Sequence, residues 1–512
     1  MIWLAIIGAL LLAVVLYDLL QTRHTILRNF PIIGHFRYML EAVGPELRQY
    51  IVTSNDEERP FSRDQRSWVY ASAKLENNYF GFGTDNDLEL TPNYLIVRHA
   101  AFPKHTPHKG EDGYDETWPL AVGKVLGGPR GRAKAFRPVS VVNVSAMSYG
   151  SLSGAAVEAL NRGAAEAPCL HNTGEGGISP YHRKGGELIW QVGTGYFGCR
   201  NETGGFDLER FLEAVESAPV RAVEIKLSQG AKPGLGGVLP GVKVTPEIAA
   251  IRGVPEGKDC ISPGDHRAFH GVDEMLDFVE MLAERSGLPI GIKSAIGQMD
   301  FWIELAERMA GEDRGVDFIT IDGGEGGTGA APLTFSDHVG LPFKVAFPSV
   351  YRIFAERGIA QNVVWIGSGR LGFPEKALLA FALGCDAINV AREAMMAIGC
   401  IQAQRCHTDH CPTGVTTHNK WLVRGLVPDQ KYGRLANYVR TLRKELVELA
   451  HSCGVDHPNQ ITLDNLEIVD DALQSRPARA IFGYQPGWAG GKVKPFASQQ
   501  GTDHVTVRLP TR

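Results

Sequence analysis

The chain has 512 residues, of which 44% are apolar, and a formal net charge of −5 at pH 7. This length exceeds one average domain, although a single α/β barrel can occupy about 250 residues. The mild negative charge excludes the basic surplus typical of nucleic-acid-binding proteins, so we expect no nucleic acid as a partner. The eight cysteines show no disulfide framework, which favours a cytosolic environment over secretion.

An apolar run opens the chain. It extends from Ile2 to Tyr17, is interrupted by Asp18 and closes with Leu19 and Leu20, which is just long enough to span a bilayer. No Lys or Arg precedes the run and no A-x-A site comes after it, so a cleaved signal peptide fits less well. Arginines at positions 23, 28 and 37 place the remainder of the chain in the cytoplasm by the positive-inside rule. We therefore expect residues 1–22 to be a single-pass anchor in the cytoplasmic (inner) membrane; a buried N-terminal helix is the alternative.

Residues 23–138 are mixed in composition and show no repeat. Their second half is rich in aromatic side chains, among them Trp68, Tyr70, Tyr79, Phe80 and Phe82. We expect an accessory N-terminal region that covers one end of the main domain and carries no chemistry.

From Ser140 onward, short apolar strands, glycine-rich turns and helical stretches alternate. Near-continuous apolar strands that alternate with helices indicate a parallel sheet buried on both faces. About eight such units fit an α/β fold of the (β/α)8 TIM-barrel type better than an open sheet. We expect this barrel over residues 139–420, with strands at Val141–Met147, Leu170–Asn172, Leu188–Val192, Ala222–Leu227, Ile290–Ala295, Asp317–Ile321, Val363–Ile366 and Ala387–Val390.

Glycine-rich turns come after several of these strands, at the face where barrel active sites lie. The last two strands end in Gly367–Arg370 and Ala391–Arg392, the usual barrel location for a phosphate. Backbone N–H groups and two arginine side chains would hold a dianion there. An ordinary surface ion pair is the alternative role for these arginines.

Three cysteines come after the last strand, at Cys400, Cys406 and Cys411, and Pro412 stands directly behind them. Thiolates are soft ligands that suit iron–sulfur clusters, and short loops let one segment wrap a cluster. Three cysteines predict a cluster with three iron positions, or a fourth ligand from elsewhere. Three buried thiols without a metal are the alternative.

A phosphate site beside a cluster-binding segment predicts a phosphorylated redox cofactor, and FMN is the simplest choice. A cluster passes one electron at a time, whereas a flavin can accept electrons singly and deliver a hydride. Lys293, at the end of a core strand, is placed to counter negative charge on a reduced flavin ring. A buried lysine needs such a partner or task because its desolvation is costly.

Seven stretches, in order, resemble the FMN-binding synthase domain of glutamate synthases over roughly residues 141–464. So many ordered matches are more specific than any single glycine motif. The chain is identified as a glutamate synthase-like protein in a stand-alone, membrane-anchored form. The stretches are Ser145–Gly150, Asn172–Gly177, Gln191–Gly198, Glu224–Gly234, Leu239–Pro246, Gly326–Pro332 and Cys406–Val415.

The resemblance implies FMN, a 3Fe-4S cluster, and the reduction of 2-iminoglutarate, formed from 2-oxoglutarate and ammonia, to L-glutamate. It implies that Cys400, Cys406 and Cys411 bind the cluster. The family usually has a small residue where Arg392 stands, so this chain departs from the pattern there. The implied FMN contacts are Ala146, Met147 and Ser148 along the ring, Gln191 and Lys293 at its polar edge, and Ser368, Gly369, Arg370, Ala391 and Arg392 at the phosphate.

The resemblance also implies that 2-oxoglutarate is bound by Glu175, Gln229, Lys232 and Arg252. Lys232 and Arg252 can neutralise its two carboxylates, the arginine with bidentate geometry. Glu175 could exchange a proton as the imine is reduced. Glu175 and Lys232 are therefore the expected catalytic residues, and a solvated loop lysine is the alternative for Lys232.

Full glutamate synthases begin with a glutaminase domain whose N-terminal cysteine attacks glutamine. Here Met1 leads into the apolar run and the first cysteine is Cys169. We therefore expect free ammonia, a separate amidotransferase subunit, or another amine as the nitrogen source. We expect ferredoxin or a partner reductase, and not NAD(P)H bound to this chain, to supply the electrons.

Residues 421–512 are expected to form a C-terminal helical region and a tail. Leucines and a tyrosine recur at helical spacing between Leu435 and Leu449, and the pattern ends near Gly454. This predicts a helix packed against the barrel. The tail from Gly483 is rich in Gly, Pro and Gln, which is typical of a loosely held extension.

Three functions stay open at this point. The first is the glutamate synthase-like oxidoreductase. The second is a related FMN barrel enzyme that acts on another amine or 2-oxo acid, such as the N-methylglutamate synthase type. The third is a non-catalytic electron-transfer subunit, against which the complete set of substrate residues argues.

Overall fold

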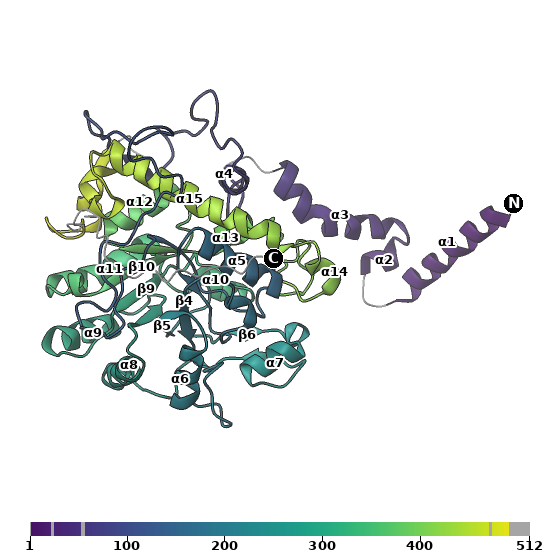
Figure 1. Ribbon diagram of the computed structural model, residues 1–512. Coiled ribbons are helices and arrows are strands. Elements are labelled where there is room, and N and C mark those ends of the chain that lie inside the picture. Colours follow the sequence, from purple (N-terminus) through teal and green to yellow (C-terminus); the bar gives the residue numbers. More distant parts are fainter. Residues whose placement is uncertain (1, 22–24, 53–56, 471–473, 491–512) are drawn as a thin grey trace. The chain divides into compact units, whose positions relative to one another are not determined.

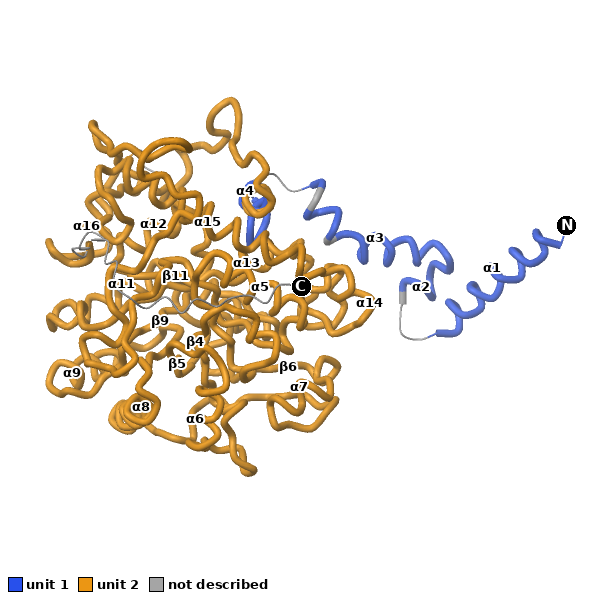
Figure 2. The backbone as a smooth tube through the Cα atoms, viewed as in Figure 1, with its two compact units in different colours: residues 1–68 blue, residues 69–512 orange. Residues whose placement is uncertain are grey.

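The computed structural model describes residues 2–21, 25–52, 57–470 and 474–490. The chain forms two compact units, residues 1–68 and residues 69–512 (Figure 2). The domain boundaries expected at residues 22, 138 and 420 stay predictions.

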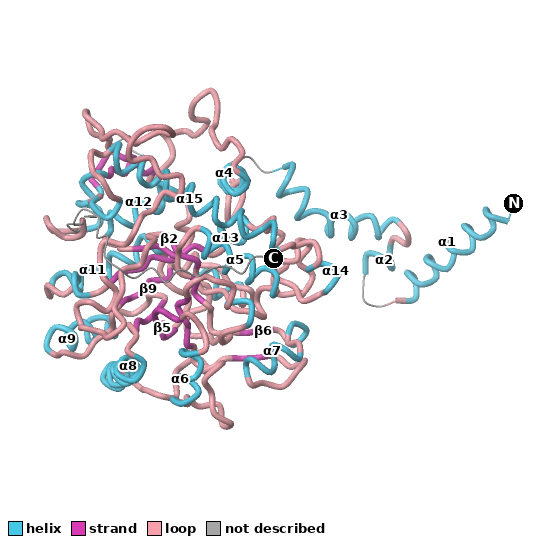
Figure 3. Tube along the Cα trace, in the orientation of Figure 1, coloured by secondary structure: helices cyan, strands magenta, loops and turns pink. Residues whose placement is uncertain are grey.

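A closed barrel of eight parallel strands forms the centre of the second unit, in the order β10-β11-β2-β3-β4-β5-β8-β9. Each strand overlaps one that the sequence predicts, and β4 and β11 have the predicted bounds, so the predicted α/β barrel is confirmed. In Figure 3 the strands lie at the centre with helices around them. The strands are β2 (Val142–Val144), β3 (His171–Asn172), β4 (Leu188–Val192), β5 (Val220–Lys226), β8 (Ile290–Ser294), β9 (Phe318–Asp322), β10 (Val364–Ser368) and β11 (Ala387–Val390).

Helices connect most of these strands and cover the outside of the barrel (Figure 1). The first begins where the Ser153 hydroxyl accepts a hydrogen bond from the Ala156 N–H, an N-cap that satisfies one free backbone donor. After β3 a 3-10 turn (Pro180–His182) replaces the helix. The covering helices are α5 (Gly154–Glu166), α6 (Leu208–Glu216), α8 (Val272–Ser286), α9 (Asp300–Gly311), α11 (Phe343–Glu356), α12 (Pro374–Leu383) and α13 (Arg392–Ala397).

Shorter elements occupy the loops between the larger strands and helices. The hairpin of β6 and β7 lies within the segment that links β5 to α8. These elements are β6 (Val238–Leu239), α7 (Pro246–Arg252), β7 (Cys260–Ile261), α10 (Leu333–His338) and α14 (Lys420–Val423).

The C-terminal region packs on the barrel, as predicted. Helix α15 (Pro428–Ser452) buries Leu435, Leu442 and Leu446 and lies beside α5. Strand β12 (Leu466–Val469) pairs antiparallel with β1 (Tyr94–Val97) and with β13 (Ser475–Pro477), which precedes α16 (Ala478–Phe482). Accessory and C-terminal segments therefore share one small sheet.

The start of the tail is held more firmly than its composition predicts. Tyr484 stacks on Tyr351 with an interplanar angle of 7°, and its hydroxyl donates to the carbonyl of Leu383 at 2.8 Å. Aromatic stacking and this hydrogen bond fix the chain at the start of the tail. The part of the predicted tail beyond Gly490 lies outside the described residues.

The first unit consists of helices. They are α1 (Ile2–Leu20), α2 (Thr25–Asn29), α3 (Ile33–Leu47), a π-helical turn (Arg48–Val52) and the first part of α4 (Arg63–Lys74). By length and composition α1 could cross a membrane, a property that a signal sequence or a buried core helix shares. The predicted N-terminal helix is thus present, and its insertion into a membrane belongs to the proposal below.

Candidate active site at the carboxyl end of the barrel

A buried carboxylate, Glu224 on β5, organises the interior of the barrel. Its two oxygens accept hydrogen bonds from Asn172 (2.8 Å), Gln191 (2.7 Å) and Thr320 (2.6 Å), which lie on three different strands. These donors satisfy a charge that would otherwise be costly to bury. Gln191, expected at the edge of a flavin, is therefore fixed in orientation within this network.

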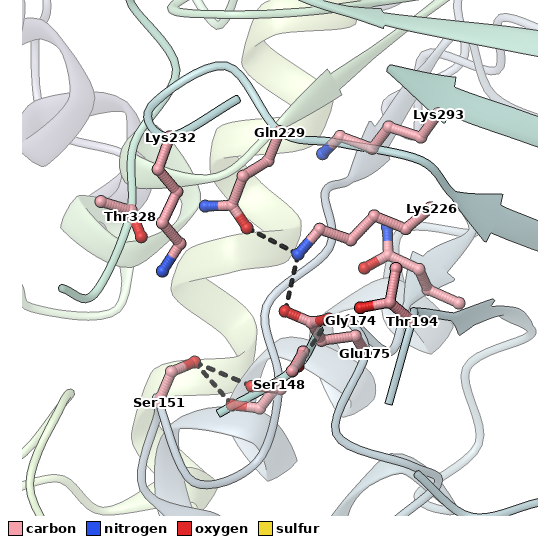
Figure 4. A network of polar contacts seen from close by, with 12 residues as sticks. Ser148, Ser151, Gly174, Glu175, Thr194, Lys226, Gln229, Lys232, Lys293 and Thr328 are labelled. Atoms are coloured by element: carbon pink, nitrogen blue, oxygen red, sulfur yellow. Dashed lines mark hydrogen bonds and ion pairs between the residues drawn. The ribbon is translucent and has the colours of Figure 1, made fainter. Parts of the chain in front are cut away.

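A lysine that we did not predict occupies the centre of the site. Lys226, at the end of β5, donates from Nζ to Glu175 Oε1 and to Gln229 Oε1, both at 2.6 Å (Figure 4). Burial is the largest influence and would raise the pKa of Glu175, but Lys226 and two further cations nearby together lower it. Glu175 is therefore a carboxylate, and Lys226 joins two of the expected substrate residues.

A second lysine–carboxylate pair lies on the neighbouring strands. Lys293 Nζ on β8 is 3.4 Å from Asp322 Oδ2 on β9, and that carboxylate also accepts the Gly230 N–H at 2.9 Å. Burial is the largest influence and would lower the pKa of Lys293, but Asp322 and two further carboxylates nearby together raise it. Lys293 is therefore a cation held at the end of its strand. The Asp322 carboxylate is the partner that its burial requires.

The two expected carboxylate-binding cations are both buried. Lys232 donates from Nζ to the carbonyl of Ala330 at 2.7 Å, and burial lowers its pKa to about 8. Arg252, in the last turn of α7, donates from Nη2 to Ser148 Oγ at 3.2 Å and to the carbonyl of Tyr149 at 3.0 Å. Lys232 is thus buried in the site, contrary to the alternative of a solvated loop lysine.

The segment expected along the flavin ring, Ala146–Ser148, begins two residues after β2. A Cβ on Gly174 would lie 2.6 Å from the Ser148 nitrogen, and one on Gly176 would lie 2.8 Å from the Ser148 Cβ. Only glycine permits this approach of two backbones. The loops after β2 and β3 are therefore packed together, with Glu175 between the two glycines.

The expected phosphate-binding residues come together because β10 and β11 are paired neighbours. Ser368 ends β10; Gly369 (φ +128°) and Arg370 (φ +56°) turn the chain, and Ala391 and Arg392 stand directly after β11. Arg392 is half-buried and donates from Nη2 to the carbonyl of Glu325 at 2.5 Å. It is therefore held by backbone, unlike a surface ion pair.

One buried amide lies beside this turn. Asn389 on β11 is in register with Ser368 on β10 and Asn143 on β2. Both amide atoms of Asn389 are buried and have no hydrogen-bond partner among the described residues. Buried polar groups are normally satisfied, so this amide fits a site that receives a polar ligand.

The segment with the three cysteines is tightly coiled. Gln402, Gln404 and Asp409 have positive φ angles of 55° to 62°, so the chain reverses repeatedly between Cys400 and Cys411. None of the three cysteines forms a disulfide within the described residues. Burial alone would raise the pKa of Cys411, but hydrogen bonds centred on Thr416 and Thr413 lower it, which favours the thiolate.

The described residues contain no group of three or more His, Cys, Asp or Glu side chains arranged to hold one metal ion. In an iron–sulfur cluster each thiolate binds a different iron, so its ligands stand farther apart than those of a single ion. The donor chemistry and the coiled loop fit a cluster.

A buried lysine joins the cysteine loop to the loop after β2. Lys243 Nζ donates to the carbonyl of Ser151 at 2.7 Å and to that of Cys406 at 3.2 Å. Burial lowers the pKa of Lys243 to about 8, and the nearby Cys406, Asp409 and Cys411 act in the opposite direction. We did not predict this residue, although a lysine inside the apolar Val242–Val244 stretch was a visible signal.

Comparison with known proteins agrees with the resemblance seen in the sequence. The model of the conserved region in glutamate synthase matches residues 130–456. The chain belongs to the glutamate synthase family. It is 40% identical to the glutamate synthase large subunit-like protein YerD of Bacillus subtilis, over 88% of this chain and 92% of that one.

Other relatives are longer than the region that they share with this chain. The archaeal glutamate synthase [NADPH] of Methanocaldococcus jannaschii is 36% identical over 62% of this chain and 59% of its own length. The glutamate synthase [NADPH] large chain of Bacillus subtilis is 30% identical over 60% of this chain and only 20% of its own length. Among solved structures, the flavin-binding domain of baker's yeast flavocytochrome b2 is 14% identical over 78% of this chain and 82% of that one, with a TM-score of 0.43. That likeness is too distant to bear on cofactor or substrate.

Proposed function

We propose that this glutamate synthase-type oxidoreductase reduces 2-iminoglutarate, formed from 2-oxoglutarate and ammonia, to L-glutamate. FMN in the barrel and a 3Fe-4S cluster on the cysteine loop would supply the electrons. The observation that carries the proposal is the convergence of Glu175, Lys226, Gln229 and Lys232 at the carboxyl end of a barrel (Figure 4). The names of the relatives support the same activity.

The residues fit FMN at two points. Arg370 and Arg392 stand at the adjacent ends of β10 and β11, beside the positive-φ glycine Gly369, and would hold the phosphate. The unpaired Asn389 amide and the fixed Gln191 amide offer hydrogen bonds to a polar ring. Bound FMN would supply hydride transfer to the substrate.

Three cations suit a dicarboxylate substrate. Lys232 and Arg252 would neutralise the two carboxylates of 2-oxoglutarate, since both side chains are buried and charged groups in a dry site interact strongly. Lys226 would keep Glu175 ionised and Gln229 oriented. The substrate residues are thereby held in place before the substrate binds.

Glu175 would handle protons. Because its pKa is lowered, it is a carboxylate in the resting protein. It would accept a proton as ammonia adds to the C2 carbonyl carbon of 2-oxoglutarate, and return it as water leaves. Lys226, within 2.6 Å, would limit the negative charge that this base presents to the substrate.

The electron path and the partners belong to the same proposal. Cys400, Cys406 and Cys411 would bind the cluster, and ferredoxin or a partner reductase would reduce it. Ammonia would come from solution or from a separate amidotransferase subunit. Helix α1 would anchor the protein in the cytoplasmic membrane, with the catalytic unit in the cytoplasm. The mean hydropathy of α1, 2.4, supports this role.

The experiment that tests the proposal measures the product. Full-length protein in nanodiscs receives reduced ferredoxin, 2-oxoglutarate and ¹⁵N-ammonium, and mass spectrometry detects ¹⁵N-glutamate. We expect glutamate to form only when all three are present. Turnover with methylamine but not ammonium would indicate the N-methylglutamate synthase type instead. Protein that contains FMN yet forms no amino acid from any amine would contradict the proposal.

A further inference from the structure

Helix α3 carries an unpartnered apolar stripe. Ile33, Phe36, Leu40, Val43 and Leu47 recur at alternating spacings of three and four, which places them on one face of the helix. Their exposed fractions run from 75% at Ile33 to 39% at Leu47. The rest of the helix surface includes Arg37 and Glu41, which form an ion pair of 2.8 Å. An exposed apolar stripe of this length needs a covering partner.

The start of α3 is tied to the end of α1. The Asp18 carboxylate, two residues before the last residue of α1, accepts the Ile32 N–H at 3.0 Å and lies 2.9 Å from His35 Nε2. Asp18 is fully buried by these contacts, whereas the rest of α1 is largely exposed. The carboxylate therefore acts as a fixed junction between the two helices.

Close packing stiffens this junction. Leu27 on α2 is buried, and a Cβ on Gly34 would lie 2.9 Å from Leu27 Cδ2 and 3.2 Å from the Ile26 carbonyl oxygen. A larger residue at position 34 would therefore require Leu27 to shift where α3 passes α2. Figure 1 shows α1, α2 and α3 in succession.

The junction also fixes the depth of α3. A helix of 19 residues is about 28 Å long, which is about the thickness of the hydrocarbon core of a bilayer. If α1 spans the membrane, Asp18 lies at the boundary with the headgroups, and so do Ile32 and His35. Helix α3 therefore starts at the depth where interfacial helices lie.

We propose that α3 lies in the interface of the bilayer that α1 enters, with its apolar stripe turned towards the acyl chains. The protein then holds the membrane by a spanning helix and a surface helix. Lipid is the occupant that these contacts favour over a second copy, because the junction brings α3 to the boundary of the same membrane. Arg28 and Arg37 would face anionic headgroups. The inference rests on the proposed anchoring by α1.

A photocrosslinking experiment tests it on the full chain. Para-benzoylphenylalanine replaces Leu40 on the stripe, Ala42 on the opposite side of α3, or Leu10 in α1, and the proteins are irradiated in native membranes. Residues two positions apart on a helix do not share a face, so Ala42 is a matched control. We expect at least about tenfold more lipid adduct at Leu40 than at Ala42, and strong lipid adduct at Leu10.

The outcomes separate the two claims. Lipid adduct at Leu10 with equal, low adduct at Leu40 and Ala42 would overturn the surface position of α3 and leave the anchor intact. Protein adduct at Leu40, within one chain or between two, would overturn it in favour of a protein partner. No lipid adduct at Leu10 or Leu40 would overturn both claims.

Discussion

Lys226 and Lys293 are register partners on the adjacent parallel strands β5 and β8, and both side chains are buried. Each ammonium faces its own carboxylate, Glu175 at 2.6 Å and Asp322 at 3.4 Å. Two lysines side by side in a low-dielectric interior would repel each other without these partners. The first pair thus lies among the residues expected to bind substrate, and the second contains the lysine expected at the flavin edge.

Lys226→Gln tests the first cation. The change removes the positive charge beside a buried carboxylate. We expect a loss of roughly 3 kcal/mol of transition-state stabilisation, which is at least a hundredfold in kcat/KM for 2-oxoglutarate. The pKa of Glu175 should also rise, so that the acidic limb of the pH profile moves to higher pH. Lys134→Gln, an exposed lysine, is the control. An unchanged acidic limb would show that Lys226 does not set the charge of Glu175.

The pKa of Lys232 predicts the alkaline limb of the pH profile of kcat/KM. Its pKa is lowered to about 8 by burial, so it is protonated below that pH and loses its charge above it. Binding of a dianionic substrate should therefore weaken as the pH rises through about 8, seen as a falling kcat/KM. Lys232→Arg should abolish this limb, because arginine stays charged. Lys232→Ala should weaken 2-oxoglutarate binding and leave the flavin spectrum intact; loss of FMN would mean that the loop belongs to the cofactor.

Gly369 tests the phosphate site. Gly369→Ala adds a Cβ at φ +128°, about 3.3 Å from the Gly323 nitrogen, and strains the turn by about 1–2 kcal/mol. Gly358→Ala is a matched control, with φ +72° and no atom within 4 Å of the new Cβ. Both variants should be slightly less stable, but only Gly369→Ala should lose bound FMN, measured by absorbance after gel filtration. Equal FMN content in the two would contradict the assignment.

Cys406→Ser tests the cluster. The variant should lose most of its iron and the electron paramagnetic resonance signal of the oxidised cluster, since a hydroxyl is a poor replacement for a soft thiolate. Cys453→Ser, at the end of α15, should keep both. Wild-type iron content in Cys406→Ser would remove this cysteine from the ligand set.

Lys243→Met removes a buried positive charge whose Nζ contacts the Cys406 carbonyl at 3.2 Å. Loss of a nearby cation disfavours the reduced cluster, so its midpoint potential should fall by on the order of tens of millivolts. Lys243→Arg should restore part of the shift. Potentiometric titration monitored by electron paramagnetic resonance measures it, and an unchanged potential would leave Lys243 a purely structural link.

The strands and their order along the chain were predictable because a parallel barrel buries both faces of its sheet. Leu188–Val192 and Ala387–Val390 are therefore nearly continuous apolar runs with the bounds that the structure has. The helix α15 was predictable for a related reason, since its apolar residues recur at the three- and four-residue spacings of one helix face. The expected site residues came from motif resemblance, and their roles remain proposals.

The sequence does not predict which distant side chains pair with one another. Lys226 ends strand β5 and contacts Glu175, which is 51 positions away, so no local pattern links the two. Lys243 likewise joins Ser151 to Cys406 across separate loops. The tail after Gly483 has the composition of a loose extension, yet Tyr484 stacks on Tyr351. In each case a tertiary contact, rather than local propensity, decides the outcome.

Reoxidation of the reduced flavin shows whether 2-oxoglutarate and ammonium together accept its electrons. The full-length protein is reduced without oxygen in a nanodisc, and the flavin absorbance is recorded after 2-oxoglutarate and ammonium are added together or singly. We expect the oxidised flavin spectrum to return only when both are present, with one L-glutamate formed per flavin reoxidised. A flavin that stays reduced with both compounds, or a purified protein that holds no flavin, would contradict it.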